Sequence, residues 1–373
     1  MKLIKNSVLF TALVSLVVAC TQSPTTKKVD EIKELKTEIV SQFNVSQDSL
    51  LSQYGSRIDI KRNSKGDLLF AIRGKSKILV YDKNYTYKQT MLNKGKGPEE
   101  VSGYFSSFLV GTDSLFVQDP QQKLIHVYGL SKAGLYEFSR TFLFDIFLHP
   151  NETMFFAANI FPHANPNSFW LNFQSIELDK SIDDKKYVQF VAEITKDGKI
   201  VTDNTHYLSV SDFKLIDSIL GGKVNEAIPY GKYYDYKVDA SGILWLSDSG
   251  KGTISKDNKV VVDLGALVQR NEVKEADINR LDEQHRKDFS GSFPKQKPYF
   301  YQYKPVADDL IIINAADAEN DKTILFMNTQ NEILGRIISD ISLYNVISFE
   351  NNRLMYSSYE NDEQIVKTMK VAF

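Results

Sequence analysis

The chain has 373 residues, of which 45 are Lys or Arg and 47 are Asp or Glu, so its net charge is only −2. This balance shows no basic excess of the kind that draws proteins to nucleic acid, and no polybasic block that would hold the chain on a charged membrane surface. The sequence holds a single cysteine, which excludes any disulfide within the chain. We therefore expect a fold that is stabilised by packing.

The first residues have the parts of a signal peptide. Lys2 and Lys5 give a positively charged start, and an apolar stretch follows over residues 8–18. That stretch is too short for a permanent membrane helix, which needs about 20 apolar residues. Ala19, a small residue, ends it directly before Cys20. We predict a signal peptide over residues 1–19.

Cys20 is the only cysteine and directly follows the apolar stretch, where it resembles the lipobox cysteine of bacterial lipoproteins. The resemblance implies that Cys20 is the lipid attachment site, with the signal removed and the new amine acylated. Several acyl chains hold a protein on a membrane stably, whereas one holds it marginally. The alternatives are an ordinary signal peptide with a chance cysteine, or an uncleaved anchor. Because Thr21 is not acidic, we expect the outer membrane of the cell envelope rather than inner-membrane retention.

The segment after the cysteine is polar, with mixed charge and one proline at Pro24. We interpret residues 20–36 as a lipidated tether that holds the following part off the membrane. Residues 37–373 then form one domain. This division gives a signal peptide, a tether and a single large domain.

The mature chain consists largely of short apolar and β-branched runs that are separated by Gly, Asp, Asn and Ser, which is typical of β-strands. Residues 57–92 contain four such runs with tight turns, and residues 104–142 repeat that layout. Four strands joined in this way are typical of a propeller blade.

Four looser units follow, at about residues 154–199, 234–262, 299–333 and 343–369. The last unit lacks a full outer strand, which residues 38–45 could supply by closing the ring and leaving no exposed edge. The sequence therefore predicts an all-β fold, a six-bladed β-propeller.

Two insertions are predicted to be helical. Residues 211–220 begin with Ser211 as a candidate N-cap, carry an apolar face and end at two glycines. Residues 266–289 are longer and strongly charged, with a thin apolar stripe. We interpret the second insertion as a solvated helix on the propeller rim, with a lid or a partner-binding helix as the alternative.

The loop at residues 94–101, Lys-Gly-Lys-Gly-Pro-Glu-Glu-Val, resembles a G-x-G-P-x-E segment of six-bladed TolB-like or NHL-like propeller lipoproteins of Bacteroidota. The resemblance implies a six-bladed propeller and little chemistry. The loop lacks the Lys-Ser/Thr ending of a P-loop and opens no predicted helix. We interpret it as a structural connector. The alternative is a ligand-contact loop, in which Lys94, Lys96, Glu99 and Glu100 would touch the ligand.

No residue pattern indicates a catalytic or metal site. The histidines are scattered without a close pair, at His126, His149, His163, His206 and His285, whereas zinc needs several converging ligands. No nucleophile elbow occurs, and the carboxylates at loop positions are interpreted as turn residues: Asp248, Asp317, Glu319 and Asp321. Trp170 and Trp245 lie in strand-like runs, as core residues or, alternatively, as a platform for a sugar. We therefore assign no catalytic residue, no metal and no cofactor.

These observations favour a monomeric, membrane-anchored extracytoplasmic lipoprotein whose propeller binds a protein, peptide or glycan without catalysis. The alternative is an extracytoplasmic hydrolase or lyase whose carboxylates and histidines meet at the propeller channel. Propellers host both classes, so the fold alone does not choose between them.

Overall fold

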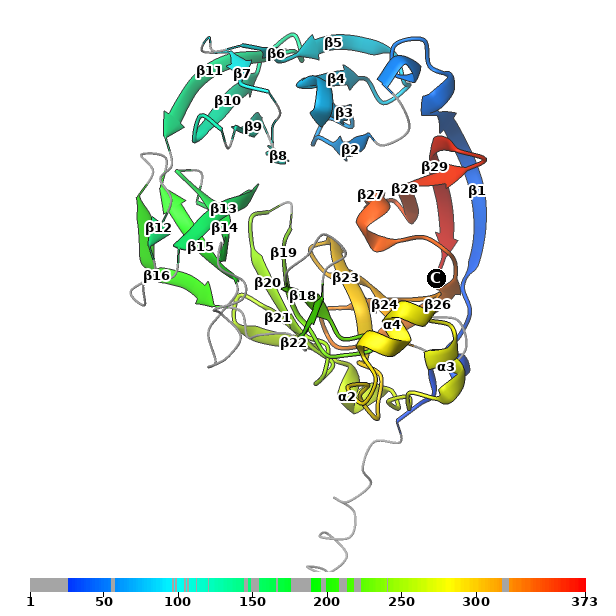
Figure 1. Cartoon of the computed structure of the whole chain (residues 1–373). Helices are drawn as coiled ribbons and strands as arrows, with labels where there is room; N and C mark the ends of the chain where they lie inside the picture. The colour runs from blue at the N-terminus through cyan, green and yellow to red at the C-terminus, as the bar shows by residue number, and fades with distance from the viewer. Residues whose placement is uncertain are drawn as a thin grey trace, which may run out of the picture.

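The blades of this chain form a ring around one axis (Figure 1). The computed structural model describes residues 26–54, 58–95, 97, 99–103, 105, 107–111, 113–119, 121–143, 147–148, 154–165, 167–175, 189–195, 199–207, 213–217, 223–239, 241–316 and 322–373. The predicted signal peptide and Cys20 lie outside these residues. No helix within the described ranges is long and apolar enough to cross a membrane.

Six antiparallel sheets make the six blades, as predicted. In order along the chain, blade 1 is β2 (Asp59–Arg62), β3 (Leu68–Ile72), β4 (Lys77–Tyr81) and β5 (Tyr87–Met91), and blade 2 is β8 (Ser107–Val110), β9 (Ser114–Asp119), β10 (Leu124–Leu130) and β11 (Tyr136–Leu143). Blade 3 is β12 (Phe147–Leu148), β13 (Met154–Phe161), β14 (Ser168–Ser175), β15 (Gln189–Thr195) and β16 (Ile200–Tyr207), and blade 4 is β19 (Tyr234–Val238), β20 (Leu244–Asp248), β21 (Thr253–Lys256) and β22 (Lys259–Asp263). Blade 5 is β23 (Phe300–Ala307), β24 (Leu310–Ala315), β25 (Thr323–Asn328) and β26 (Ile333–Ile338), and blade 6 is β27 (Val346–Glu350), β28 (Arg353–Glu360) and β29 (Glu363–Ala372), with β1 (Lys36–Asn44) as its fourth strand. Strands β2, β8, β13, β19, β23 and β27 face the axis (Figure 1).

The N-terminal strand closes the ring, which confirms the prediction for residues 38–45. β1 pairs with β29 from Lys36 opposite Ala372 to Asn44 opposite Ile365. Blade 6 is thus built from both ends of the described chain, and the outer edge of β29 is covered. Unpaired strand edges invite association with other chains, and this pairing removes one.

A buried glutamine fastens the closing blade to blade 1. The Gln364 side chain accepts a hydrogen bond from the Ile58 N–H at 3.1 Å and donates one to the Ile58 carbonyl at 2.9 Å. Gln364 is 1% exposed, so both backbone groups would otherwise be buried without partners, at a cost of about 1–3 kcal/mol each. The first and last blades therefore meet through a satisfied polar contact.

The core consists of apolar layers between neighbouring blades. Residues alternate along each second strand, so that Leu69 and Ala71 pack against blade 2, while Leu68 and Phe70 pack against blade 6. This alternation is the period of a β-strand that is buried on both faces. Every blade therefore depends on both of its neighbours.

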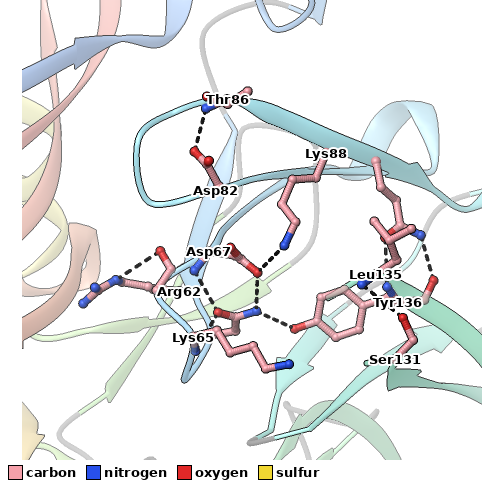
Figure 2. Close-up of polar contacts among 12 residues, drawn as sticks. Arg62, Lys65, Asp67, Asp82, Thr86, Lys88, Ser131, Leu135 and Tyr136 are labelled. Carbon is pink, nitrogen blue, oxygen red and sulfur yellow. Dashed lines mark hydrogen bonds and ion pairs between the residues drawn. The ribbon is translucent and has the colours of Figure 1, made fainter. Parts of the chain in front are cut away.

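Polar contacts add to the seam between blades 1 and 2 (Figure 2). Asp67 accepts a hydrogen bond from Lys88 at 3.0 Å, and Asn63 donates to both Asp67 and the Tyr136 hydroxyl at 3.2 Å. The turn itself needs Gly66, whose φ of +88° lies in the region that glycine tolerates best. A turn within blade 1 thereby also holds blade 2.

The first predicted helix, at residues 211–220, is wrong. The chain there forms β17 (Phe213–Asp217), which pairs antiparallel with β18 (Lys223–Ala227); Ser211 lies outside the described residues. Two glycines after a short apolar run indicate a hairpin as well as a helix end, and five paired residues are enough for a strand. The insertion before blade 4 is thus a β-hairpin.

The second predicted helix, at residues 266–289, is three short helices instead of one. They are α2 (Leu264–Leu267), α3 (Glu275–Asn279) and α4 (Glu283–Asp288). Asp263 and Asp282 cap α2 and α4 by accepting from the N–H groups of Ala266 and His285, and Asp277, inside the first turn of α3, accepts from the N–H of Lys274. Capping of this kind starts a new helix wherever such a residue lies, and the thin apolar stripe gives no continuous face to bury.

A buried ion pair holds this insertion in place. Lys297 Nζ lies 3.0 Å from Asp277 Oδ1, with side-chain exposures of 0% and 4%. The Lys297 ammonium also lies 5.3 Å from the centre of the Tyr230 ring. Burial raises the pKa of Asp277, but the hydrogen bond from the Lys274 N–H and the Lys297 charge outweigh it and lower that pKa.

Part of the segment that was interpreted as a tether lies against the propeller. Lys27 pairs with the chain after α2, through hydrogen bonds to Leu267 at 3.0 Å and from Gln269 at 2.9 Å. The Leu35 N–H donates to the Arg336 carbonyl of β26 at 2.8 Å. The apolar residues Val29, Ile32 and Leu35 are buried there, between 4% and 7% exposed. The boundary at residue 37 stays a prediction, but propeller contacts begin at Lys27.

We expect Leu35→Ala to lower the free energy of unfolding by about 2–5 kcal/mol, because it leaves a cavity in the core of blades 5 and 6. Denaturant unfolding followed by intrinsic fluorescence measures the change. Glu34→Ala, at an exposed neighbour, is the matched control and should alter stability by less than about 0.5 kcal/mol. Equal, small effects of both variants would contradict the docking of this segment.

We expect Lys297→Met to cost about 3–5 kcal/mol, because it leaves the Asp277 carboxylate buried without its cation. The double variant Asp277→Asn/Lys297→Met should recover most of that loss. Since the pKa of Asp277 is lowered in the folded protein, its contribution is present above the ordinary carboxyl pKa and is lost as the pH falls through the lowered value. Thermal unfolding at pH 7 and at acidic pH measures both effects, and a single variant as stable as the wild type would refute the role of the pair.

Candidate functional site

Three lysines occupy the same position on the innermost strands of three blades. Lys61 on β2 lies opposite Leu69, Lys237 on β19 opposite Trp245, and Lys304 on β23 opposite Ile312. The partner is in each case eight residues further along the chain. Because inner strands run alike around a propeller, equivalent positions lie at equal depth beside the axis. We call Lys61, Lys237 and Lys304 the axial lysines.

Each axial lysine reaches the inner part of the next blade. The Lys61 ammonium donates to the Phe108 carbonyl of β8 and lies 4.4 Å from the centre of the Phe108 ring. The Lys304 ammonium donates to the Val346 carbonyl of β27. These contacts leave further N–H donors on each ammonium, which carries three.

Lys237 is held by an acidic neighbour and two aromatic rings. Its Nζ lies 2.7 Å from Asp235 Oδ2, with side-chain exposures of 29% and 24%. The same ammonium lies 6.0 Å from the centre of the Tyr303 ring and 5.5 Å from that of Tyr344. Solvent therefore reaches this pair, and a ligand from solvent can reach it too.

The charges at the axis act on one another. Burial lowers the pKa of Lys304 to about 8, with the charges of Lys61 and Lys237 acting in the same direction. Burial and the Arg73 charge likewise lower the pKa of Lys61 to about 8, with Asp59 acting in the opposite direction. An anion placed among these groups would relieve their repulsion.

Tyr344 is the exposed aromatic residue beside this cluster. It belongs to the 3₁₀ turn η5 (Leu343–Asn345) directly before β27, and it is 70% exposed. Its ring centre lies 5.5 Å from the Lys237 ammonium, so a ligand that reaches this cation can also contact the ring. A cation and an open aromatic face thus lie side by side.

The topology places the insertions at the end of the ring where Tyr344 lies. Strands alternate in direction within a blade, so the starts of the inner strands share one end with the turns that join second to third strands. That end also carries the β17–β18 hairpin before β19, the α2–α4 segment before β23, and the loop before β8. We call this end the insertion face.

A pocket of about 400 Å³ opens on the insertion face at blade 1. It is lined by Tyr54, Asp59, Ala71, Ile72, Arg73, Gly74 and Lys75. Arg73 pairs with Asp59 at 2.5 Å; the Arg73 charge lowers the pKa of Lys61 and the Asp59 charge raises it. Basic and aromatic groups therefore continue from the axis toward this pocket.

The loop with the family-like sequence is closed on itself. β6 (Asn93–Lys94) pairs in parallel with β7 (Glu100–Val101), and the Gly97 N–H donates to Glu100 Oε2 at 2.7 Å. A Cβ on Gly95 would lie 1.9 Å from the same carboxylate. Glu100 is thus occupied inside the loop, while Lys94 and Glu99 are exposed. Lys96 lies outside the described residues.

This loop lies toward the outer strands β5 and β11 rather than at the axis (Figure 1). It therefore does not meet the axial lysines. Its role as a ligand contact stays a prediction, and the internal hydrogen bonds favour the connector interpretation.

His163 and His206 both contact the Trp170 ring, with 4.7 and 5.7 Å between the ring centres, whereas His126 and His285 lie elsewhere in the fold. His126 is fully buried on β10, as a packing residue would be. His163 lies 3.5 Å from Glu193, and its Nδ1 accepts a hydrogen bond from the Asn165 N–H at 2.9 Å. His285 pairs with Asp282 on the α4 segment at 2.5 Å. In the part of the chain that the structure describes, no three His, Cys, Asp or Glu side chains gather as metal ligands.

The other residues that were weighed from the sequence are turn and core residues. Asp248 accepts from the N–H groups of Gly250 and Lys251 at 3.0 Å, which confirms a turn role. Trp170 and Trp245 are 4% and 0% exposed, which confirms the core interpretation over a sugar platform. His149, Asp317, Glu319 and Asp321 lie outside the described residues.

The sequence prediction missed the axial lysines, because single lysines in strand-like runs form no motif. A sequence signal was nevertheless present. In three units, a lysine directly follows an aromatic or aliphatic residue and stands eight residues before a buried strand residue. Only an alignment of the blades by register shows that these lysines are equivalent.

No protein-family model matches this chain, and no curated protein matches it either. Several solved structures are similar to it. A member of the DUF4221 family from Bacteroides vulgatus is 12% identical, with a TM-score of 0.48, over 91% of this chain and 99% of its own. A Bacteroides fragilis protein whose name assigns it to the exported proteins is 12% identical, with a TM-score of 0.49, over 93% and 99%. Virginiamycin B lyase from Staphylococcus aureus is 10% identical, with a TM-score of 0.41, over 90% and 99%. With TM-scores below 0.5 these likenesses carry no argument, and the propeller fold rests on the sheets of this chain.

Proposed function

We propose that this chain is a lipoprotein of the cell envelope, anchored in the outer membrane through lipid on Cys20, whose propeller binds a ligand at the axis without chemical conversion. The ligand is a protein, peptide or glycan. The anchor rests on the signal-like N-terminus and the position of Cys20. The binding role rests on the axial lysines and Tyr344.

The observation that carries the proposal is that three blades carry a lysine at the same register position of the innermost strand, and that the charges of Lys61 and Lys237 act on Lys304. A packing role would be served by an apolar residue, since burial of a charge costs free energy. Polar groups from separate blades that lie near one another, one of them open to solvent at Lys237, are instead typical of a binding site, in which a few placed polar groups fix the ligand.

The alternative is a hydrolase or lyase that acts at the same axis. General acid–base catalysis needs a group whose pKa lies near the working pH, and the pKa values of Lys61 and Lys304, about 8, meet that condition. Asp235, the carboxylate next to Lys237, is occupied by an ion pair. The geometry of cations and an aromatic ring favours binding over this alternative.

The anchor is tested with Cys20→Ala. We expect the variant to leave the membrane fraction or to keep its signal peptide, because it has no thiol to receive lipid. Cell fractionation and intact-mass measurement read out both results. Thr21→Ala changes the adjacent residue but keeps the thiol, so it is the matched control and should be processed normally. Unchanged membrane association and mass in Cys20→Ala would refute the anchor.

Ligand binding is tested on a panel of neutral and acidic oligosaccharides and peptides, with the purified full chain in detergent. We expect binding of at least one class, with the ligand recovered intact. Lys304→Gln should weaken that binding by about tenfold or more, while Lys259→Gln, exposed on β22, should not. The absence of binding to every class would refute the binding role, and a cleaved ligand would establish the enzymatic alternative.

A further inference from the structure

We propose that the ligand of the axial site is an acidic saccharide, whose carboxylates contact Lys61, Lys237 and Lys304 and one of whose sugar rings lies on Tyr344. This ligand class rests on the proposed binding function and makes it specific. It is carried by the equivalent placement of the lysines, by their remaining donors, and by the exposed ring beside them.

Charge selects an anion at this site. The axial lysines place three cations on the inner strands, against Asp235 within the cluster and Asp59 at its edge. Arg73 adds a further cation at the edge. Charge interactions are stronger near partly buried groups than in bulk water. Carboxylates brought into the site would therefore gain more than they would on an open surface.

The placement of the cations selects a ligand with several separate charges. Lys61 belongs to blade 1, Lys237 to blade 4 and Lys304 to blade 5. The three ammonium groups are fixed by different partners: the Phe108 carbonyl, Asp235 and the Val346 carbonyl. A ligand with one charge could meet one of them, whereas a chain of acidic units can meet more than one.

The aromatic ring selects a sugar. Tyr344 is 70% exposed, and the Lys237 ammonium lies 5.5 Å from its centre. An aromatic side chain joins an apolar face to a polar tip, and so can cover the C–H face of a pyranose. In a uronate the carboxylate is attached to that same ring, so one residue can meet Tyr344 and Lys237 together. Simple anions would leave the ring unused.

Calorimetric titration of the full chain in detergent tests the proposal with four probes: trigalacturonate, neutral maltotriose, inorganic phosphate and hexaglutamate. We expect trigalacturonate to bind at least about tenfold more tightly than each of the others. Equal binding of maltotriose would overturn the charge selection. Equal binding of phosphate would reduce the site to a general anion site, and tighter binding of hexaglutamate would assign it to acidic peptides; either result overturns the saccharide.

Variants separate the two parts of the site. Lys237→Gln and Lys61→Gln should each weaken trigalacturonate binding about tenfold or more, whereas Lys259→Gln should leave it unchanged. Tyr344→Ala changes an exposed residue, so the variant should fold normally. We expect it to weaken the binding of trigalacturonate and to leave the binding of phosphate unchanged. Thermal unfolding of each variant identifies any that fails to fold. Unchanged binding in Tyr344→Ala would overturn the stacking, and unchanged binding in both lysine variants would overturn the site.

The pH dependence gives an independent readout. Lys61 faces Arg73 and Asp59, Lys304 faces Lys61 and Lys237, and Lys237 faces Asp235, Tyr303 and Tyr344. Since the pKa values of Lys61 and Lys304 are about 8, a rise from about pH 7 to about pH 9 removes positive charge, while uronate carboxyls stay ionised. Affinity should therefore fall over this range. Constant affinity would contradict the role of the lysines.

These results are distinguishable from a failure of the proposed function. If a neutral glycan or a peptide binds at the axis and trigalacturonate does not, the binding function stands and the acidic saccharide is wrong. If no member of the wider panel binds, the binding function itself is wrong.

Discussion

The pairing of β1 with β29 is the constraint on which the rest of the structure depends. A propeller blade has no complete core of its own, since each sheet buries its two faces against its neighbours. The ring therefore holds only if the last blade meets the first. The backbone pairs from Lys36 to Asn44 complete blade 6, and the two hydrogen bonds between Gln364 and Ile58 join it to blade 1.

Closure also determines what can happen at the axis. When every blade is held by two neighbours, the six inner strands have fixed positions, and side chains from distant parts of the sequence meet. Lys61 and Lys304 are far apart along the chain, yet the charge of Lys61 acts on the pKa of Lys304. A site built in this way is preorganised, because the scaffold rather than the ligand holds the charged groups in place. The N-terminal segment that closes the ring is also the segment that leads back to the predicted lipid.

Much of the fold could be predicted because its signals are local. Two turns are built alike. Asn63 and Asp239 each accept two backbone N–H groups through the side-chain oxygen, and Gly66 and Gly242 each have a positive φ. The repeat of the units is therefore visible in the sequence. The helical predictions were less successful, because a short apolar run before two glycines fits both a helix end and a hairpin. The site could not be predicted, because it depends on which lysines share a depth at the axis. That depth follows from the strand register, which composition and short motifs do not reveal.

The identity of the residue at the axial position varies among the blades, and this variation bears on function. In blade 6 the inner-strand residue that pairs with Met355, on the face toward blade 1, is Ser348, although its partner lies seven rather than eight residues further along. The architecture thus accepts a small residue on an inner strand where three other blades carry lysine. Partial burial of an ammonium costs free energy that leucine would not, and the mutual repulsion of the three adds to that cost. Packing therefore gives no reason for these lysines, whereas an anionic ligand would offset both costs while it is bound.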